Sequence, residues 1–246
     1  VVLAALCLLV SEPVRQGLQP AVAGAATPVA EITGWIRENV RVYAALLVGV
    51  PCIVLVLYGL QAWGPTYLVR VHAMSLGEAG TRYGLIALLA GSLGVLSGPF
   101  VARYLERLGY TDAQLRVAVI ALALMCPALF GLALAPGPGF ALACIAALSY
   151  LVPLPLALVA TAVQAVTPNR MRGVVVGAYV VTTNVIGLAL GPSLVAVITE
   201  YVFRDPAAVG KSLALAGTAT AMLGILLVGR GLAPFGALIV SLREPV

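Results

Sequence analysis

The stretch Val42–Val69, VYAALLVGVPCIVLVLYGLQAWGPTYLV, contains no Asp, Glu, Lys or Arg. Its apolar residues follow one another without the alternation typical of a half-buried β-strand, which favours a helix. A helix needs about 20 such residues to cross a hydrocarbon core roughly 30 Å thick. This stretch is therefore predicted to span a membrane.

Five further uncharged intervals have the same character, and none shows the alternating pattern of a membrane β-barrel. They are Tyr83–Ala102, Val117–Pro136, Phe140–Val166, Gly173–Thr199 and Ser212–Gly229. The sequence thus predicts an all-α membrane protein in which residues 42–242 form a six-helix transmembrane bundle. Residues 243–246 are predicted to be a cytoplasmic tail.

The composition supports this fold class and excludes several functions. Of the 246 residues, 62% are hydrophobic and 9% are charged, against about 25% charged in a soluble domain. The net charge is +5, but the basic residues form no run that could follow phosphates, so nucleic acid is not an expected partner. No G-x-S-x-G or Walker motif is present, so the protein is not expected to be an enzyme. Four scattered cysteines and one histidine predict neither a metal site nor a cofactor.

The first 41 residues differ from the rest of the chain. Residues 1–10 are apolar but long enough for only about 15 Å of helix, and we interpret them as the end of a truncated transmembrane helix. Residues 11–41 are rich in Gly, Pro and Ala and are predicted to be a cytoplasmic linker. A cleaved signal peptide is the weaker alternative, because a basic n-region is missing and Glu12 and Arg15 interrupt the segment. The chain is therefore expected to be part of a longer polypeptide.

The charged residues predict the orientation of the bundle. With six spans, nine basic residues fall on the linker side and four on the other, so the linker side is expected to be cytoplasmic and the protein to be multi-pass in a plasma (inner) membrane. Arg230 is not assigned by this count. We predict one long helix that contains Pro234, continues to Leu242 and places Arg230 near the cytoplasmic interface. All nine acidic residues fall in loops or at helix ends, so a coupling carboxylate is expected outside this chain.

Several polar and aromatic residues interrupt the predicted spans and are candidates for a substrate-binding cavity. A buried amide or hydroxyl needs a partner, which a polar cavity would supply. Trp63 has a second interpretation as an interfacial anchor. The fourth helix is expected to break near its middle, at Pro153 and Pro155. The candidate substrate-binding residues are Tyr58, Gln61, Trp63, Ser149, Tyr150, Gln164 and Asn184.

Two helices carry small residues at a four-residue spacing. Gly94 and Gly98 form such a face on the second helix, and Gly187 and Gly191 form one on the fifth. Small faces allow close helix packing, which is the commoner role. Pro192 follows Gly191 and is expected to bend the fifth helix, as suits a bundle that rocks during transport.

These motifs resemble the C-terminal half of a major facilitator superfamily transporter, and more narrowly the spinster-like branch. The resemblance rests on Trp63–His72, on the glycine-rich second helix with its following arginines, on Gln164–Arg172 (QAVTPNRMR) and on Asn184–Pro192 (NVIGLALGP). It implies a missing N-terminal six-helix half as a partner. It also implies alternating access, a lysolipid-like amphipathic substrate, contact with membrane lipid, and proton coupling.

The cytoplasmic loop that carries Arg103 and Arg107 is similar to a gating motif of the superfamily. The resemblance implies a gating role for both arginines. However, the aspartate of that motif falls near Ala102 or Arg103, and this sequence has no acid there. We therefore expect either a relay rebuilt with Glu106 or a vestigial motif.

The predicted function is that of a secondary transporter for an organic, amphipathic or lipid-like solute. A carrier of small organic anions or drugs is an alternative. A non-transporting membrane scaffold or sensor of transporter ancestry is another.

Overall fold

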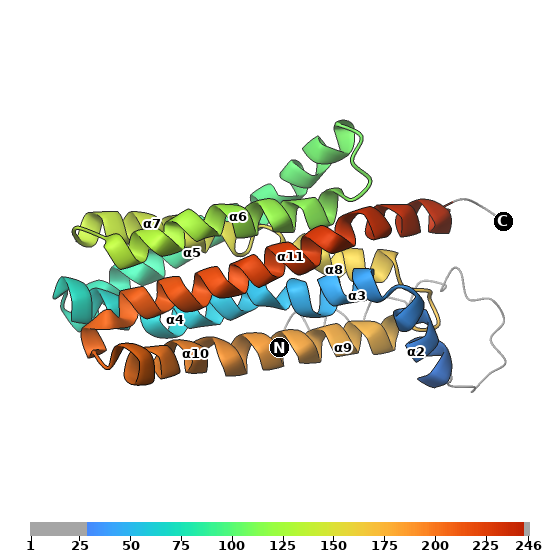
Figure 1. The fold of residues 1–246 in the computed structure, drawn as a ribbon. Coiled ribbons are helices and arrows are strands. Elements are labelled where there is room, and N and C mark those ends of the chain that lie inside the picture. The colour runs from blue at the N-terminus through green and yellow to red at the C-terminus, as the bar shows by residue number, and fades with distance from the viewer. Residues whose placement is uncertain (1–28, 244–246) are drawn as a thin grey trace, which may run out of the picture.

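The computed structural model describes residues 29–243, and the predictions for residues 1–28, Cys7 and residues 244–246 lie outside this range. The described chain is a bundle of long helices that run side by side (Figure 1). The elements are α2 (Val29–Glu38), α3 (Val40–Ala44), η1 (Ala45–Gly49), α4 (Pro51–His72), α5 (Leu76–Arg107), α6 (Ala113–Leu134), α7 (Pro138–Leu151), α8 (Leu156–Ala165), α9 (Arg172–Asn184), η2 (Val185–Leu190), α10 (Gly191–Val197), η3 (Ile198–Phe203), η4 (Pro206–Ala208) and α11 (Val209–Arg243).

Within residues 29–243, six helical stretches are long and apolar enough to cross a membrane, which confirms the six predicted spans. The shortest has 22 residues, or about 33 Å at 1.5 Å per residue. The stretches are Val40–His72, Leu76–Arg107, Ala113–Leu134, Pro138–Ala165, Arg172–Phe203 and Pro206–Leu242. Most extend beyond the uncharged intervals, because a helix continues into the interface, where charged side chains reach water.

The helix ends follow local sequence signals. Ser75 caps α5 by accepting a hydrogen bond from the backbone N–H of Glu78 at 3.3 Å, the spacing of a capping box. Before it, Ala73 ends α4 in the left-handed conformation, with a φ of 52°. Part of the predicted linker is helical, because Ile32 and Trp35 of α2 pack against the core.

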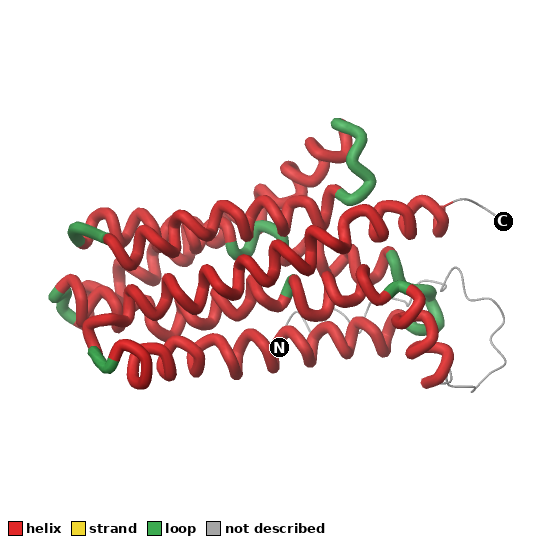
Figure 2. Tube along the Cα trace, viewed as in Figure 1, coloured by secondary structure: helices red, strands yellow, loops and turns green. Residues whose placement is uncertain are grey.

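The fourth span is interrupted as predicted. Helix α7 ends at Leu151 and α8 begins at Leu156, and the break is visible as a short loop within the bundle (Figure 2). Pro153 and Pro155 have no N–H to donate to the carbonyls four residues earlier, which ends the helix there. The fifth span also changes its winding, with the π-helical segment η2 directly before Gly191 and Pro192.

The sixth span is the predicted long helix. Helix α11 runs from Val209 to Arg243 with Pro234 inside it. It packs along α6 and α4, and its Phe235 side chain is fully buried. The core also contains Tyr43, Leu46 and Tyr67. The three cysteines of the described range, Cys52, Cys126 and Cys144, are free thiols among apolar neighbours.

Candidate functional site

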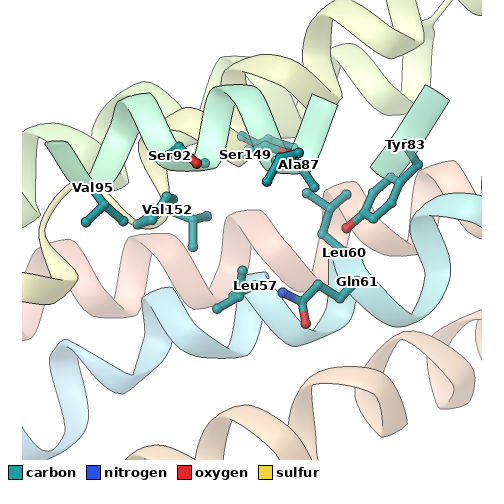
Figure 3. Close-up of a pocket in the computed structure, with 13 residues that line it drawn as sticks. Leu57, Leu60, Gln61, Tyr83, Ala87, Ser92, Val95, Ser149 and Val152 are labelled. Carbon is teal, nitrogen blue, oxygen red and sulfur yellow. The ribbon is translucent and has the colours of Figure 1, made fainter. Parts of the chain in front are cut away.

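A cavity of about 380 Å³ lies between α4, α5 and α7. Its wall is mainly apolar, with Leu57 and Leu60 on α4 facing Ala87 and Val95 on α5 (Figure 3). The polar side chains among the residues that line it are uncharged: Gln61, Tyr83, Ser92 and Ser149. The site can therefore hold an apolar group and offer it a few hydrogen-bonding partners.

The glycine face of α5 packs closely against the segment around the break between α7 and α8. Both α5 and this segment line the cavity. A Cβ at Gly94 would collide with the carbonyl oxygen of Tyr150, and one at Gly98 with that of Leu154. The broken segment between α7 and α8 thus lies directly against α5. Both glycines therefore lie at a close helix contact.

The proline break also leaves a polar backbone group near the cavity. Pro153 cannot donate a hydrogen bond to the carbonyl of Ser149, four residues earlier. That oxygen lies 3.7 Å from the Cβ position of Gly91, and both residues line the cavity. The carbonyl adds an acceptor next to the Ser149 hydroxyl.

The structure brings two of the seven candidate substrate-binding residues, Gln61 and Ser149, into this cavity. Gln61 is exposed, and its side chain extends from α4 below the α5 wall in Figure 3. Tyr150 lies next to Ser149 but points elsewhere, because its hydroxyl accepts a hydrogen bond from Ser97 Oγ at 2.9 Å. It joins α7 to α5.

The other four candidates lie away from this cavity. Trp63 Nε1 donates to the Pro192 carbonyl at 3.0 Å and links α4 to α10. Asn184 Nδ2 donates to the Val180 carbonyl of its own helix at 2.8 Å, so its amide has a partner without any cavity. Tyr58 packs against Gly187 and Gly191. Gln164 is exposed near the end of α8.

The small residues of the fifth span form a close crossing with α4. A Cβ at Gly187 would lie 2.6 Å from Val54 Cγ1, and one at Gly191 would lie 2.7 Å from the Leu55 carbonyl oxygen. Pro192 contributes its carbonyl to the Trp63 hydrogen bond. The three residues therefore hold the bend of the fifth span against α4.

Arg103 and Arg107 lie exposed at the end of α5. The Arg103 guanidinium is held by its own helix, where Nε donates to the Pro99 carbonyl at 3.3 Å and the group lies 4.9 Å from the Phe100 ring centre. The gating role of both arginines stays a prediction.

An ion pair that the sequence analysis missed lies close by, at the start of α6. Asp112 is only 6% exposed and receives two hydrogen bonds from Arg116, at 3.2 and 2.9 Å. The Arg116 guanidinium also lies 3.9 Å from the ring centre of Tyr110. The four-residue spacing of Asp112 and Arg116 at a helix start was the available signal.

The cavity also contains two polar residues that were not predicted, Tyr83 and Ser92. Tyr83 is the first residue of the uncharged interval Tyr83–Ala102, and its ring lies against Gly64 of α4. Ser92 belongs to the glycine-rich segment of α5, which was considered only for packing. A hydroxyl at the middle of a span was the signal that could have identified Ser92.

Comparison with known proteins identifies the family. Residues 1–192 match the family model of the Major Facilitator Superfamily. An MFS-type efflux pump of Mycolicibacterium smegmatis is 40% identical over 57 residues, which are 23% of this chain and 13% of the pump.

Two crystal structures of a bacterial homolog of the human lysosomal transporter Spinster are similar in fold. The inward-facing, unoccupied structure has a TM-score of 0.66 at 18% identity and covers 98% of this chain and 57% of that one. The inward-facing, occupied structure has a TM-score of 0.61 at 19% identity and covers 83% and 51%. The chain thus spans about half the length of these structures, and the expected fold is confirmed. The match over residues 1–192 shows that the chain belongs to the Major Facilitator Superfamily of membrane transporters.

Proposed function

We propose that this chain forms one half of a secondary transporter that moves an organic, amphipathic solute by alternating access. The observation that carries this proposal is the cavity between α4, α5 and α7, which combines an apolar wall with four uncharged polar side chains. An acyl chain or apolar ring fits such a wall, and the Gln61 amide and the Ser149 hydroxyl would bind a polar group of the same molecule.

The exposed apolar faces of the second and fifth spans support a partner that covers part of the bundle. In the most apolar part of Val40–His72, 67% of residues are buried, but only 17% are in Leu76–Arg107 and 11% in Arg172–Phe203. Lipid covers such faces in a membrane, and a second six-helix half would cover those beside the cavity. We propose the N-terminal half as that partner, which agrees with the length of the solved structures.

The substrate class rests on the cavity and on the spinster-like resemblance together. A lysolipid has one apolar chain and a polar head, and the uncharged wall suits its chain. A carrier of small organic anions or drugs is the second candidate. The identity of 40% over 57 residues to an efflux pump favours export as the direction of transport.

The coupling group is proposed to lie outside this chain. Within residues 29–243, the acidic residues lie in loops, in α2 or near the ends of the spans. Proton-coupled carriers need a titratable group close to the middle of the membrane. We place the arginine-rich end in the cytoplasm, on the charge distribution of the loops. The plasma membrane is proposed as the location.

The test is transport by the purified full-length protein in liposomes with an imposed pH gradient. We expect flux of a fluorescent lysophospholipid that collapses when a protonophore removes the gradient. Flux restricted to small organic anions would replace the lipid proposal with the second candidate. No flux of either kind would support the scaffold alternative and refute both transport proposals.

A further inference from the structure

The polar side chains that line the cavity between α4, α5 and α7 form no hydrogen bond with any other group in residues 29–243. They are those of Gln61, Tyr83, Ser92 and Ser149. Hydroxyl groups elsewhere in the spans do find a partner: Ser97 Oγ donates to the Gly94 carbonyl at 3.1 Å, and Thr161 Oγ1 to that of Leu158 at 2.7 Å. A polar group in an apolar cavity is costly without a partner. A bound ligand is therefore expected to supply one.

Gln61 and Tyr83 lie close together at one end of this cavity. A Cβ at Gly64 would lie 2.6 Å from the Tyr83 ring, and Gly64 follows Gln61 by three residues on α4, which places both on one helix face. The Tyr83 hydroxyl points toward α4, while Val95 and Val152 line the opposite end (Figure 3). The cavity is thus polar at the end nearer the turn between α4 and α5, and apolar at the other end.

The cavity wall carries no charge. Among the described residues 29–243, those that line it include no Asp, Glu, Lys, Arg or His. Arg82, next to Tyr83, is exposed and pairs with Glu78 at 2.7 Å. Arg70 of α4 lies over the Trp63 ring, 5.9 Å from its centre. A charged group in an uncharged apolar space loses its hydration without compensation, so the part of a ligand that binds here is expected to be uncharged.

We propose that this cavity binds an uncharged, hydroxyl-bearing part of the substrate next to a single acyl chain, as in the glycerol ester of a monoacyl lipid. This inference rests on the proposed function and narrows its substrate class. The Gln61 amide and the Tyr83 hydroxyl can each donate and accept, as a ligand hydroxyl can, whereas an ionised carboxylate only accepts. The acyl chain lies toward Val95 and Val152. A charged head group, where the substrate has one, lies outside this cavity.

The experiment measures the binding of radiolabelled lipids with the same oleoyl chain to the purified full-length protein in detergent. The lipids are monooleoylglycerol, which has hydroxyl donors, methyl oleate, which only accepts hydrogen bonds, and oleate, which is charged. In the double variant Gln61→Leu/Tyr83→Phe, the affinity for monooleoylglycerol is expected to fall at least about tenfold, equivalent to roughly 1.4 kcal/mol. Binding of methyl oleate should be unchanged, which also shows that the variant has folded. The control is Tyr201→Phe, which removes an exposed hydroxyl on η3 and should change none of the affinities.

Other results would overturn the proposal. An equal loss for methyl oleate would show that the two side chains shape the cavity and do not bind a hydroxyl group. An equal loss for oleate would show that they bind a charged group. If the double variant does not fold, each single variant is expected to show a smaller loss confined to monooleoylglycerol, and unchanged affinities would contradict the proposal.

The binding assay also separates this inference from the proposed function. Lysophospholipid flux that persists without the expected selectivity would refute the inference and leave the transport proposal intact. Retained selectivity without any flux would refute transport and support the assignment of the cavity to an uncharged, hydroxyl-bearing group.

Discussion

Replacing both Gly94 and Gly98 by alanine is expected to leave little folded protein. Each new Cβ would collide with a carbonyl oxygen of the broken segment, that of Tyr150 or that of Leu154. A backbone atom cannot move aside as a flexible side chain can, so α5 must separate from α7. Overpacking of this kind costs about 1–3 kcal/mol per site, a large part of a typical total stability of roughly 5–15 kcal/mol.

The same helix offers a matched control. Gly80 and Gly84 have the same four-residue spacing on α5, and a Cβ at either position meets nothing within 4 Å. The variant Gly80→Ala/Gly84→Ala should fold as well as the unchanged protein, since alanine favours helix over glycine by about 1 kcal/mol. The measurement is the fraction of monodisperse protein that remains after heating in detergent. Equal stability of the two double variants would contradict close packing at Gly94 and Gly98.

The second large effect is expected from filling the transport cavity. Ala87 points from α5 into the space that Gln61 reaches from α4 (Figure 3). In Ala87→Trp the indole would occupy much of this space, and the substrate could no longer bind. We expect transport to fall by at least about tenfold, which corresponds to roughly 1.4 kcal/mol or more, while the protein still folds.

The control for this variant is Ala219→Trp, at an exposed position on α11, a helix that does not line the cavity. It adds the same side chain and should leave transport close to the original rate. The assay is initial flux into liposomes, normalised to the amount of folded protein. Retained flux in Ala87→Trp would show that the substrate follows another path through the molecule.

The fold could be predicted well from the sequence because charge is so costly in a membrane. Uncharged intervals of about 20 residues or more have few alternatives to a spanning helix, and the two prolines at 153 and 155 make the break in the fourth span unavoidable. The long sixth helix was a separate prediction, because the charge of Arg230 ends the uncharged interval at Gly229 while the helix continues past it. The π-helical segment η2 had no comparable signal, because its winding depends on how Gly187 and Gly191 contact α4.

The candidate site was harder to predict, for a physical reason. A polar side chain in a spanning helix can face a cavity, but it can also bond to the backbone of its own or a neighbouring helix. Gln61 faces the cavity, Asn184 donates a hydrogen bond to the backbone of its own helix, and Trp63 donates one to the backbone of a neighbouring helix. The sequence gives the residue type and helix face, but the partner depends on which helices lie side by side.

The most direct test of alternating access is the reactivity of a thiol at position 92, near the middle of α5 and in the cavity wall. The full-length protein with Ser92→Cys, and with its native cysteines replaced, would be treated in oriented vesicles with a membrane-impermeant maleimide on one side at a time. A cysteine at Met222, exposed on α11 outside the cavity wall, serves as the control. We predict that the thiol at position 92 reacts from either side and that substrate slows both reactions. The control thiol at position 222 should not react from both sides, and substrate should not change its reaction. Reaction from one side only, or none, would contradict transport by alternating access through this cavity.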